Sequence, residues 1–258
     1  MLTGMPLRST ALVTGPTAGI GTAFAEQLAA RGHDLVLVAR DRARLDELAE
    51  RLTQEYGVAA EVLVANLADR TQLSAVEARL ADRDRPVHLL VNNAGFGHKR
   101  PFLENTVEQE QEMLDVLVTA VLRLTHAALG AMVERGEGAV VNVSSVSAFL
   151  PRGTYSAAKA YVTSMSEWAD LAYRDRGVRV MALVPGFTRT EFHARMDVSR
   201  ESAPGWMWLD ADRLVADALR DLDRGRRVSV PSRRYKVLAA AARVAPTGVL
   251  GRLQGLGR

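Results

Sequence analysis

The sequence contains no cysteine, and this absence excludes disulfides, zinc–thiolate sites and thiol nucleophiles. Its five histidines are scattered without ligand spacing, so we expect no metal site. Long apolar runs are also missing, since no stretch approaches the roughly 18 residues that a membrane-spanning helix needs. Met1–Thr10 lacks the apolar core of a signal peptide. These absences predict a protein of the reducing cytoplasm.

Net charge is nearly absent as well, at +3 over 258 residues, and its positive excess is concentrated near the C-terminus. No nucleic-acid motif accompanies these basic residues, so we expect a solvated surface and no nucleic-acid partner. Within residues 235–258, basic groups alternate with apolar ones, which predicts a basic amphipathic tail. Peripheral contact with an anionic membrane is the weaker alternative to a role in covering a neighbouring subunit.

The chain is 48% hydrophobic and alternates short apolar runs with longer amphipathic stretches. The runs predict strands at Ala11–Thr14, Leu35–Ala39, Glu61–Ala65, Leu89–Val91, Ala139–Val143, Val178–Val184 and Val228–Val230. The stretches predict helices at Gly21–Arg31, Ala43–Tyr56, Arg70–Asp82, Val107–Glu134 and Tyr155–Arg176. Continuous apolar strands are typical of a parallel sheet covered on both faces. We therefore predict one α/β domain over residues 1–258, a Rossmann-type doubly wound parallel sheet of about seven strands.

Residues 187–210 break the alternation with prolines, glycines and aromatic side chains. A long irregular insertion on an α/β scaffold is usually functional, so we interpret it as a substrate flap; simple surface packing is the alternative. Aromatic and other apolar residues in and near it could line a hydrophobic substrate pocket or pack in the core: Phe149, Phe187, Phe192, Trp206, Met207 and Trp208. His193 also lies in this segment, where a surface position is the simpler interpretation.

A glycine-rich segment, TGPTAGIG at Thr14–Gly21, follows the first predicted strand and opens the first predicted helix. Glycines let a chain turn sharply and let a pyrophosphate approach bare backbone, while the helix N-terminus supplies amide donors. The spacing G-x-x-x-G-x-G differs from the common Rossmann fingerprint, but the flanking strand and helix are those that the motif needs. The segment predicts a dinucleotide site.

Three further motifs follow in order: Asn92-Asn93-Ala94-Gly95, Tyr155-Ser156-Ala157-Ala158-Lys159 and Pro185-Gly186. Together with the glycine loop they resemble the short-chain dehydrogenase/reductase family over about residues 8–230. The resemblance implies an oxidoreductase that moves a hydride between nicotinamide and a ketone or aldehyde, or the corresponding alcohol. It implies these cofactor contacts: Gly15, Thr17, Ala18, Gly19, Ile20, Gly21, Arg40, Asn66, Leu67, Asn93, Ala94, Gly95, Tyr155, Lys159, Pro185, Gly186, Thr188 and Thr190.

The end of the second predicted strand indicates which dinucleotide binds. An acidic side chain there would hold a ribose diol and repel a 2′-phosphate, but this chain has Ala39 followed by Arg40. A guanidinium suits a phosphate dianion, so we expect NADP(H) rather than NAD(H). The alternative makes Arg40 only the first residue of an arginine-rich surface helix. Some NADP-preferring relatives carry a basic residue where Ala18 stands, and Thr17 could contact the phosphate instead.

Tyr155 and Lys159 lie four residues apart and so share one face of a predicted helix. A nearby ammonium and a cationic nicotinamide would lower the pKa of the phenol and make it an effective proton donor to the substrate oxygen. The resemblance places the catalytic serine second after the fifth predicted strand, at Ser145. Its hydroxyl would stabilise charge on that oxygen. Ser144 and Ser147 are expected to be turn or cap residues.

Two features depart from the family pattern. The stretch from Ser145 to Tyr155 is a few residues shorter than in many relatives, which predicts a tighter loop on one wall of the pocket. Leu117 stands where many relatives have an asparagine that supports a proton relay to the lysine, and a leucine side chain can neither donate nor accept. This favours a runner-up hypothesis, a cofactor-binding sensor or scaffold without turnover.

The resemblance also bears on assembly. In the family, the helices corresponding to Val107–Glu134 and Tyr155–Arg176 often pair across a two-fold axis. Both have long apolar stripes here, although packing on the sheet would require such stripes too. We therefore expect a homodimer or homotetramer. The expected substrate is a small, hydrophobic carbonyl compound or alcohol.

Overall fold

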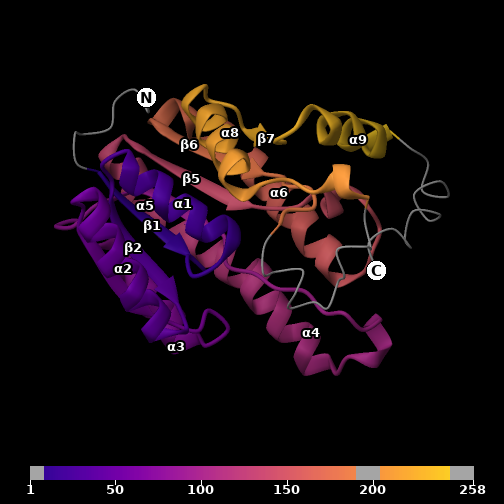
Figure 1. Cartoon of the computed structure of the whole chain (residues 1–258), viewed down its shortest axis with the longest axis horizontal. Coiled ribbons are helices and arrows are strands. Elements are labelled where there is room, and N and C mark those ends of the chain that lie inside the picture. The colour runs from indigo at the N-terminus through magenta and orange to yellow at the C-terminus, as the bar shows by residue number, and fades with distance from the viewer. Residues whose placement is uncertain (1–8, 190–203, 245–258) are drawn as a thin grey trace.

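A computed structural model describes residues 9–189 and 204–244. Its centre is a seven-stranded, wholly parallel sheet in the order β3-β2-β1-β4-β5-β6-β7. The strands are β1 Thr10–Thr14, β2 Asp34–Ala39, β3 Ala60–Val64, β4 Val87–Asn92, β5 Gly138–Val143, β6 Val178–Leu183 and β7 Val228–Ser229. The chain reverses its direction of winding between β1 and β4, which confirms the predicted doubly wound sheet of seven strands (Figure 1).

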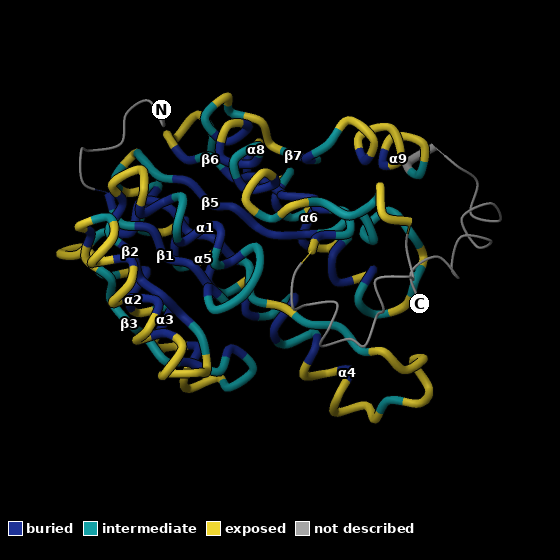
Figure 2. The backbone as a smooth tube through the Cα atoms, in the orientation of Figure 1, coloured by how far each residue is buried: buried dark blue, intermediate teal, exposed yellow. Residues whose placement is uncertain are grey.

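Helices cover both faces of this sheet. They are α1 Gly19–Ala30, α2 Arg42–Tyr56, α3 Arg70–Ala81, α5 Val121–Arg135, α6 Thr154–Tyr173 and α8 Ala211–Asp223. Two further helices, α4 Val107–Leu114 and α9 Arg233–Val244, pack against α6 and against the turn Val146–Phe149, respectively. Alternate residues of each strand point to opposite faces. Ala11 and Val13 therefore join a core with α1, α2 and α8, and Leu12 joins a second core with α3, α5 and α6. The strands are buried from both sides, as the dark centre of Figure 2 shows.

Side-chain caps explain where several helices begin. Asp41, Asp69 and Asp210 precede α2, α3 and α8, and each accepts a hydrogen bond from a backbone N–H of the first turn. Thr106 and Gln109 form a reciprocal capping box at the start of α4. The carboxyl ends of the strands thus lead into well-defined helix N-termini, and the loops between them form one edge of the sheet.

The long helix predicted at Val107–Glu134 is not uniform. It contains a π-helical turn at Asp115–Ala120 between α4 and α5, and this turn places Val116 and Leu117 toward the interior. By length and composition alone the stretch Val107–Arg135 could cross a membrane. Its buried residues include members of the core beneath the sheet, which is the ordinary position of a core helix in a doubly wound fold.

Most of the predicted elements are confirmed within a few residues, and the differences lie at their ends. The helix predicted at Tyr155–Arg176 ends at Tyr173 and continues as a 3-10 turn. The helix α8 was not predicted from the sequence: it begins directly after the proposed flap, and its apolar residues are separated by charged ones. The predicted amphipathic tail contains α9, while residues 245–258 lie outside the described part of the chain.

Candidate active site

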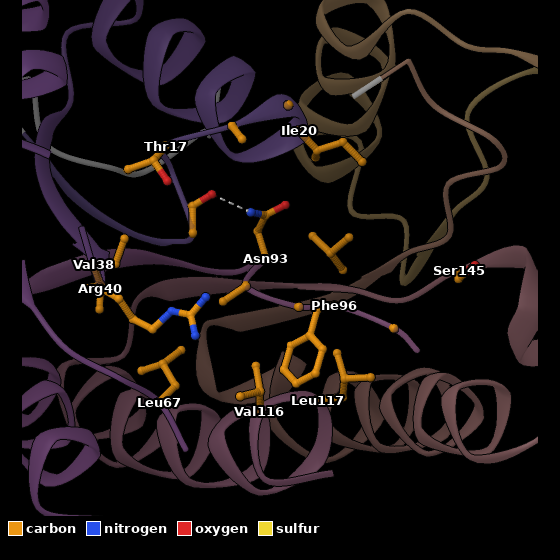
Figure 3. A pocket seen from close by; sticks show the side chains of 18 of the residues that line it. Thr17, Ile20, Val38, Arg40, Leu67, Asn93, Phe96, Val116, Leu117 and Ser145 are labelled. Atoms are coloured by element: carbon orange, nitrogen blue, oxygen red, sulfur yellow. Dashed lines mark hydrogen bonds between the residues drawn. The ribbon is translucent and has the colours of Figure 1, made fainter. Parts of the chain in front are cut away.

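A cleft of about 760 Å³ opens at the carboxyl ends of β1, β2, β4, β5 and β6. It lies where the strand order reverses, between β1 and β4, because the connections from these two strands leave in opposite directions and create a crevice there. Figure 3 looks into it, with the glycine loop on one side and the π-helical turn on the other.

The cleft brings together nearly all of the residues that the sequence singled out. The predicted residues that line it are Gly15, Thr17, Ala18, Gly19, Ile20, Arg40, Asn66, Leu67, Asn93, Ala94, Gly95, Ser145, Tyr155, Lys159, Pro185, Gly186 and Thr188. Gly21 is not among the lining residues, and Thr190 lies outside the described residues. Several lining residues were not predicted: Val38, Asp41, Arg44, Ala65, Phe96, Gly97, Glu112, Val116, Val143 and Ser144.

The glycine loop is shaped by close backbone packing. Gly15 has a φ of 65°, and a Cβ there would come within 3.0 Å of the Ala94 Cα. Gly21 does not face the cleft because it packs behind the loop, where a Cβ would meet the Gly15 carbonyl oxygen at 2.0 Å. Since α1 begins at Gly19, its N-terminal amides and its positive dipole end lie at the cleft. The loop therefore offers bare backbone to a pyrophosphate.

The Asn93 side chain holds this loop in place by hydrogen bonds. Its side-chain nitrogen donates to the carbonyl oxygens of Thr14 and Gly15, each at 3.0 Å, and Figure 3 shows it directed at the loop. The Thr14 hydroxyl in turn accepts from the backbone nitrogens of Asn93 and Ala94, each at 3.0 Å. The NNAG segment was predicted to lie beside the adenosine ribose. Asn93, Ala94 and Gly95 line the cleft, and the Asn93 side chain also links β4 to the glycine loop.

One end of the cleft is cationic. Arg40 is exposed, has no ion-pair partner among the described residues, and points into the cleft beside Leu67 in Figure 3. Arg44 lies one turn into α2, with its Nε 3.6 Å from a carboxylate oxygen of the capping Asp41. Two guanidinium groups therefore flank the position after β2, where a dinucleotide of the Rossmann type places its adenosine ribose. This arrangement could hold a phosphate on that ribose.

The other end of the cleft carries the predicted catalytic set. Ser145 follows β5, and its Oγ accepts from the Ser147 backbone nitrogen at 3.1 Å and is hydrogen-bonded to the Tyr155 side chain. Lys159 is buried one turn further along α6, with its Nζ 5.8 Å from the centre of the Tyr155 ring. The Nζ donates to the Val143 carbonyl oxygen at 2.7 Å, which fixes the ammonium at the end of β5.

Ionisation at this end is governed by burial. Burial raises the pKa of Tyr155 to about 12, against a smaller lowering by the hydrogen bond with Ser145. In the protein without cofactor the pKa of Tyr155 is thus raised, because burial dominates. The predicted lowering assumes a bound, cationic nicotinamide beside the ammonium, and it stays a prediction for that complex. Burial also lowers the pKa of Lys159 to about 8, so that most of the amine still carries its charge at neutral pH. The pair is thus a neutral phenol beside a cation.

Ser144 has a structural role that differs from the expected turn or cap. Its hydroxyl is buried, donates to the Lys159 carbonyl oxygen at 2.8 Å and shares a 2.7 Å hydrogen bond with the Thr163 hydroxyl. These bonds tie the end of β5 to the first turns of α6. Of the two adjacent serines, only Ser145 is hydrogen-bonded to Tyr155 in the described structure.

The wall between the two ends is apolar. Leu117 is fully buried at the π-helical turn, and its Cδ2 would lie 2.8 Å from a Cβ on Gly95. Together with Phe96 and Val116 it forms the lower surface of the cleft in Figure 3. The π-helical turn thus places residue 117 at the cleft, and in this chain that residue is a leucine. A side chain that cannot form hydrogen bonds thus lies against Gly95, at a position where a Cβ would be 3.9 Å from the Lys159 Nζ.

The predicted flap is described only at its two ends. None of the apolar residues proposed for the substrate pocket, Phe149, Phe187, Trp206, Met207 and Trp208, is among those lining the cleft, and Phe192 and His193 lie outside the described residues. Phe187 and Trp208 instead pack against each other, with ring centres 5.6 Å apart. Near the catalytic set, the apolar lining includes Phe96, Val116 and Leu117, of which only Leu117 was singled out from the sequence.

Several solved structures are similar to this one. A short-chain dehydrogenase from Sphingobium yanoikuyae in complex with NADPH is 38% identical, with a TM-score of 0.84 over 94% of this chain and 95% of that one. The bulky-bulky ketone specific alcohol dehydrogenase from Comamonas testosteroni is 33% identical, with a TM-score of 0.80 over 95% of both chains.

Curated relatives show both active and inactive proteins. The very-long-chain 3-oxoacyl-CoA reductase of Anas platyrhynchos is 32% identical over 73% of this chain. The inactive hydroxysteroid dehydrogenase-like protein 1 of Homo sapiens is 32% identical over 71% of this chain. The matched regions span only 62% and 57% of these relatives' own lengths.

The match to a family model covers most of the structure just described. Residues 9–200 match the model of the short chain dehydrogenases, and this range includes the glycine loop, the NNAG segment and the Ser145, Tyr155 and Lys159 set. The order of these motifs along the chain is also their order around the cleft. The chain belongs to the short-chain dehydrogenase family of oxidoreductases.

Proposed function

We propose that this protein is an NADP(H)-dependent carbonyl reductase or alcohol dehydrogenase. The observation that carries the proposal is the hydrogen bond between Ser145 and Tyr155 with the Lys159 ammonium one helical turn away, all lining the cleft that begins at the glycine loop. A phenol, a hydroxyl and a cation at one end of a dinucleotide cleft are the groups that carbonyl reduction needs.

The choice of NADP(H) rests on the cationic end of the cleft. Arg40 and Arg44 provide positive charge beside the position of the adenosine ribose, and no acidic side chain ends β2. The neighbour from Sphingobium yanoikuyae binds NADPH, and an alcohol dehydrogenase from Thermococcus sibiricus, 28% identical, binds 5-hydroxy-NADP. The glycine loop would hold the pyrophosphate, because α1 begins at Gly19 and its N-terminal amides lie at the cleft.

When bound, the nicotinamide supplies or accepts the hydride. The neutral Tyr155 hydroxyl gives its proton to the substrate oxygen during reduction and recovers it in the reverse direction. Ser145 holds that oxygen by a hydrogen bond as negative charge develops on it. The Lys159 ammonium stabilises the phenolate that remains after the proton has left, and it can also donate to the nicotinamide ribose.

The substrate that the cleft favours is a hydrophobic ketone or the corresponding secondary alcohol. Phe96, Val116 and Leu117 form an apolar surface near the catalytic set, and such a surface retains large apolar groups. Two proteins similar to this one, the bulky-bulky ketone specific alcohol dehydrogenase and the 3-oxoacyl-CoA reductase, carry names that refer to large carbonyl substrates. Bulky aryl ketones and long-chain 3-oxoacyl thioesters are therefore the first compounds to test.

The test is oxidation of NADPH, followed by its absorbance, with a panel of aryl ketones, 3-oxoacyl thioesters, steroid ketones and small aldehydes. We expect turnover with one or more of the bulky compounds, and weaker or no turnover with NADH. Tight NADPH binding without oxidation by any compound would contradict the proposal.

That result would support the second candidate, a cofactor-binding protein without turnover. Its support is Leu117, which places a hydrocarbon at the cleft in place of a polar group, and the existence of a relative named as inactive. The hydrogen bond between Ser145 and Tyr155 favours the enzyme, because a sensor does not need a proton donor held against a second hydroxyl.

The same proposal includes the assembly and the location of the protein. Large apolar side chains remain exposed on α5 and α6, with Leu171 at 63%, Trp168 at 57% and Leu122 at 45%. We propose that these faces pair in a cytoplasmic homodimer or homotetramer of single-domain chains, with 187–210 as the flap and 235–258 as the tail. Light scattering after size-exclusion chromatography tests it, since Trp168→Glu should yield monomers; a wild-type monomer would refute the assembly.

A further inference from the structure

Tyr235 is a buried residue on a helix that is otherwise largely exposed. It is only 3% exposed, whereas Val237 and Leu238 on the same helix, α9, are 69% and 45% exposed. Its ring lies directly against the backbone of Gly186, where a Cβ would come within 2.1 Å of the ring carbon Cζ. Only a glycine at that position lets the ring approach so closely. The glycine of the Pro185-Gly186 motif thus has a specific packing partner in this chain.

The Tyr235 hydroxyl joins two segments of the chain that are distant in sequence. It accepts a hydrogen bond from the Phe187 backbone nitrogen at 3.1 Å and donates one to the Met207 carbonyl oxygen at 2.8 Å. The adjacent Arg234 also donates to the Trp206 carbonyl oxygen. Burial raises the pKa of Tyr235, so the hydroxyl keeps the proton that it needs to donate. One side chain therefore fixes both described ends of the segment 187–210.

Backbone pairing joins the same two ends. The Leu209 nitrogen donates to the Phe187 carbonyl oxygen at 2.7 Å, and the Arg189 nitrogen donates to the Leu209 carbonyl oxygen at 2.9 Å. Between them Thr188 and Leu209 form an isolated bridge. These bonds make a short ladder, and Tyr235 lies against its first residues. The ladder and the tyrosine together hold the two described ends, 187–189 and 204–210, side by side.

The segment 187–189 borders the catalytic end of the cleft. Gly186 and Thr188 line the cleft, and the Thr188 hydroxyl donates to the Gly186 carbonyl oxygen at 3.0 Å. The Pro185 carbonyl oxygen accepts from the Val146 nitrogen at 3.0 Å, next to Ser145. The helix α9 also packs against the turn Val146–Phe149. A displacement of the Gly186 backbone would therefore change the wall beside Ser145 and Tyr155, while Arg40 lies at the far end.

We propose that Tyr235 is a positioning residue for the reaction, which holds the Gly186–Phe187 backbone where the nicotinamide and the substrate carbonyl meet. The inference rests on the proposed function, since it assumes that the nicotinamide lies at the catalytic end. Tyr235 itself touches no reacting group. It acts through the backbone of Gly186 and Phe187, and it couples the C-terminal helix α9 to the active site.

The test compares two ligands that differ in whether they reach this end of the cleft. On the proposed function NADPH would extend from Arg40 to the catalytic end, whereas adenosine 2′,5′-bisphosphate would occupy only the end with Arg40. Tyr235→Phe keeps the ring against Gly186 and removes both hydrogen bonds of the hydroxyl. Neutral hydrogen bonds of this kind contribute roughly two- to tenfold each to an equilibrium. We expect the Kd of NADPH to rise about tenfold in this variant and the Kd of the bisphosphate to stay within about twofold.

Tyr173→Phe is the matched control, because Tyr173 lies at the end of α6 against Trp168 and is not among the residues lining the cleft. It should change neither affinity. Tyr235→Leu, which removes the ring as well, should weaken NADPH further and again spare the bisphosphate. An unchanged NADPH affinity in Tyr235→Phe, or an equal loss for both ligands in both Tyr235 variants, would overturn the proposal. Since no carbonyl substrate is used, failure to find turnover would count against the proposed function alone.

Discussion

Removing the Tyr155 hydroxyl is the most direct perturbation of the proposed chemistry. Tyr155→Phe keeps the ring on α6 and removes the group that is hydrogen-bonded to Ser145. Tyr161 lies on the same helix, is 38% exposed and is not among the residues lining the cleft, so Tyr161→Phe is the matched control. The two variants make the same chemical change on one helix, inside and outside the site.

The expected loss follows from the state of the phenol. With its pKa raised to about 12 by burial, Tyr155 is protonated throughout the neutral range and is a donor at all times. Proton transfer by a positioned side chain contributes roughly 10²- to 10⁴-fold to a rate. This corresponds to about 3–5 kcal/mol at 1.36 kcal/mol per decade. Tyr155→Phe should therefore lower kcat for carbonyl reduction by at least about 100-fold, whereas Tyr161→Phe should leave it within about twofold.

The affinity for NADPH separates loss of chemistry from loss of structure. The contacts of the glycine loop and of Arg40 lie elsewhere in the cleft, so the Kd of NADPH in Tyr155→Phe should stay within a few-fold of the wild-type value. The assays are NADPH oxidation under saturating ketone and calorimetric titration with NADPH. Turnover of Tyr155→Phe within tenfold of the wild type would refute the assignment of Tyr155 as the proton donor. A parallel collapse of NADPH binding would instead show that the phenol holds the cleft together.

Three other outcomes follow from the structure. Arg40→Glu should weaken the affinity for NADPH at least tenfold and leave that for NADH unchanged, since charge-assisted hydrogen bonds contribute about 1.5–3 kcal/mol. Arg42→Glu is the control, because Arg42 does not line the cleft. Equal effects of the two substitutions would exclude a direct contact between Arg40 and the phosphate. Gly21→Ala should lower both the melting temperature and NADPH affinity because its Cβ would collide with a loop carbonyl, whereas Gly130→Ala, in open space on α5, should be neutral in both measurements. Burial lowers the pKa of His33 below its ordinary 6.5, so the folded state binds fewer protons than the unfolded chain, and stability should fall as the pH drops through that value. In thermal unfolding from pH 8 to pH 5, the melting temperature of His33→Gln should therefore fall less than that of the wild type. An equal fall would assign the loss of stability in acid to other groups.

The proposed catalytic residues show which parts of the site can be predicted from the sequence. Tyr155 and Lys159 are placed together by one turn of helix, which is local geometry and therefore readable from spacing. The glycine loop is readable for the same reason, because its strand and helix are its sequence neighbours. The packing of Gly21 against Gly15 behind the loop is not readable in this way, since it depends on how the loop folds back on itself.

Ionisation could not be predicted in the same way. The sequence places an ammonium near a phenol and so suggests a lowered Tyr155 pKa, but the direction depends on burial and on where the ammonium points. In the folded chain the Lys159 Nζ donates to the Val143 carbonyl oxygen, and desolvation of the phenol dominates. Neither the carbonyl group nor the degree of burial is visible in a spacing of four residues.

The sequence alone determined the parallel sheet, its order of strands and helices, and the residues at its carboxyl edge. It could do so because apolar periodicity and glycine positions act over a few neighbouring residues. Only the tertiary structure decided that Phe96, Val116 and Leu117 form the apolar wall, that Arg44 joins Arg40, and that Tyr235 fixes the backbone of Gly186. These contacts join segments far apart in the chain, so they depend on how the elements pack together, and no local pattern records them.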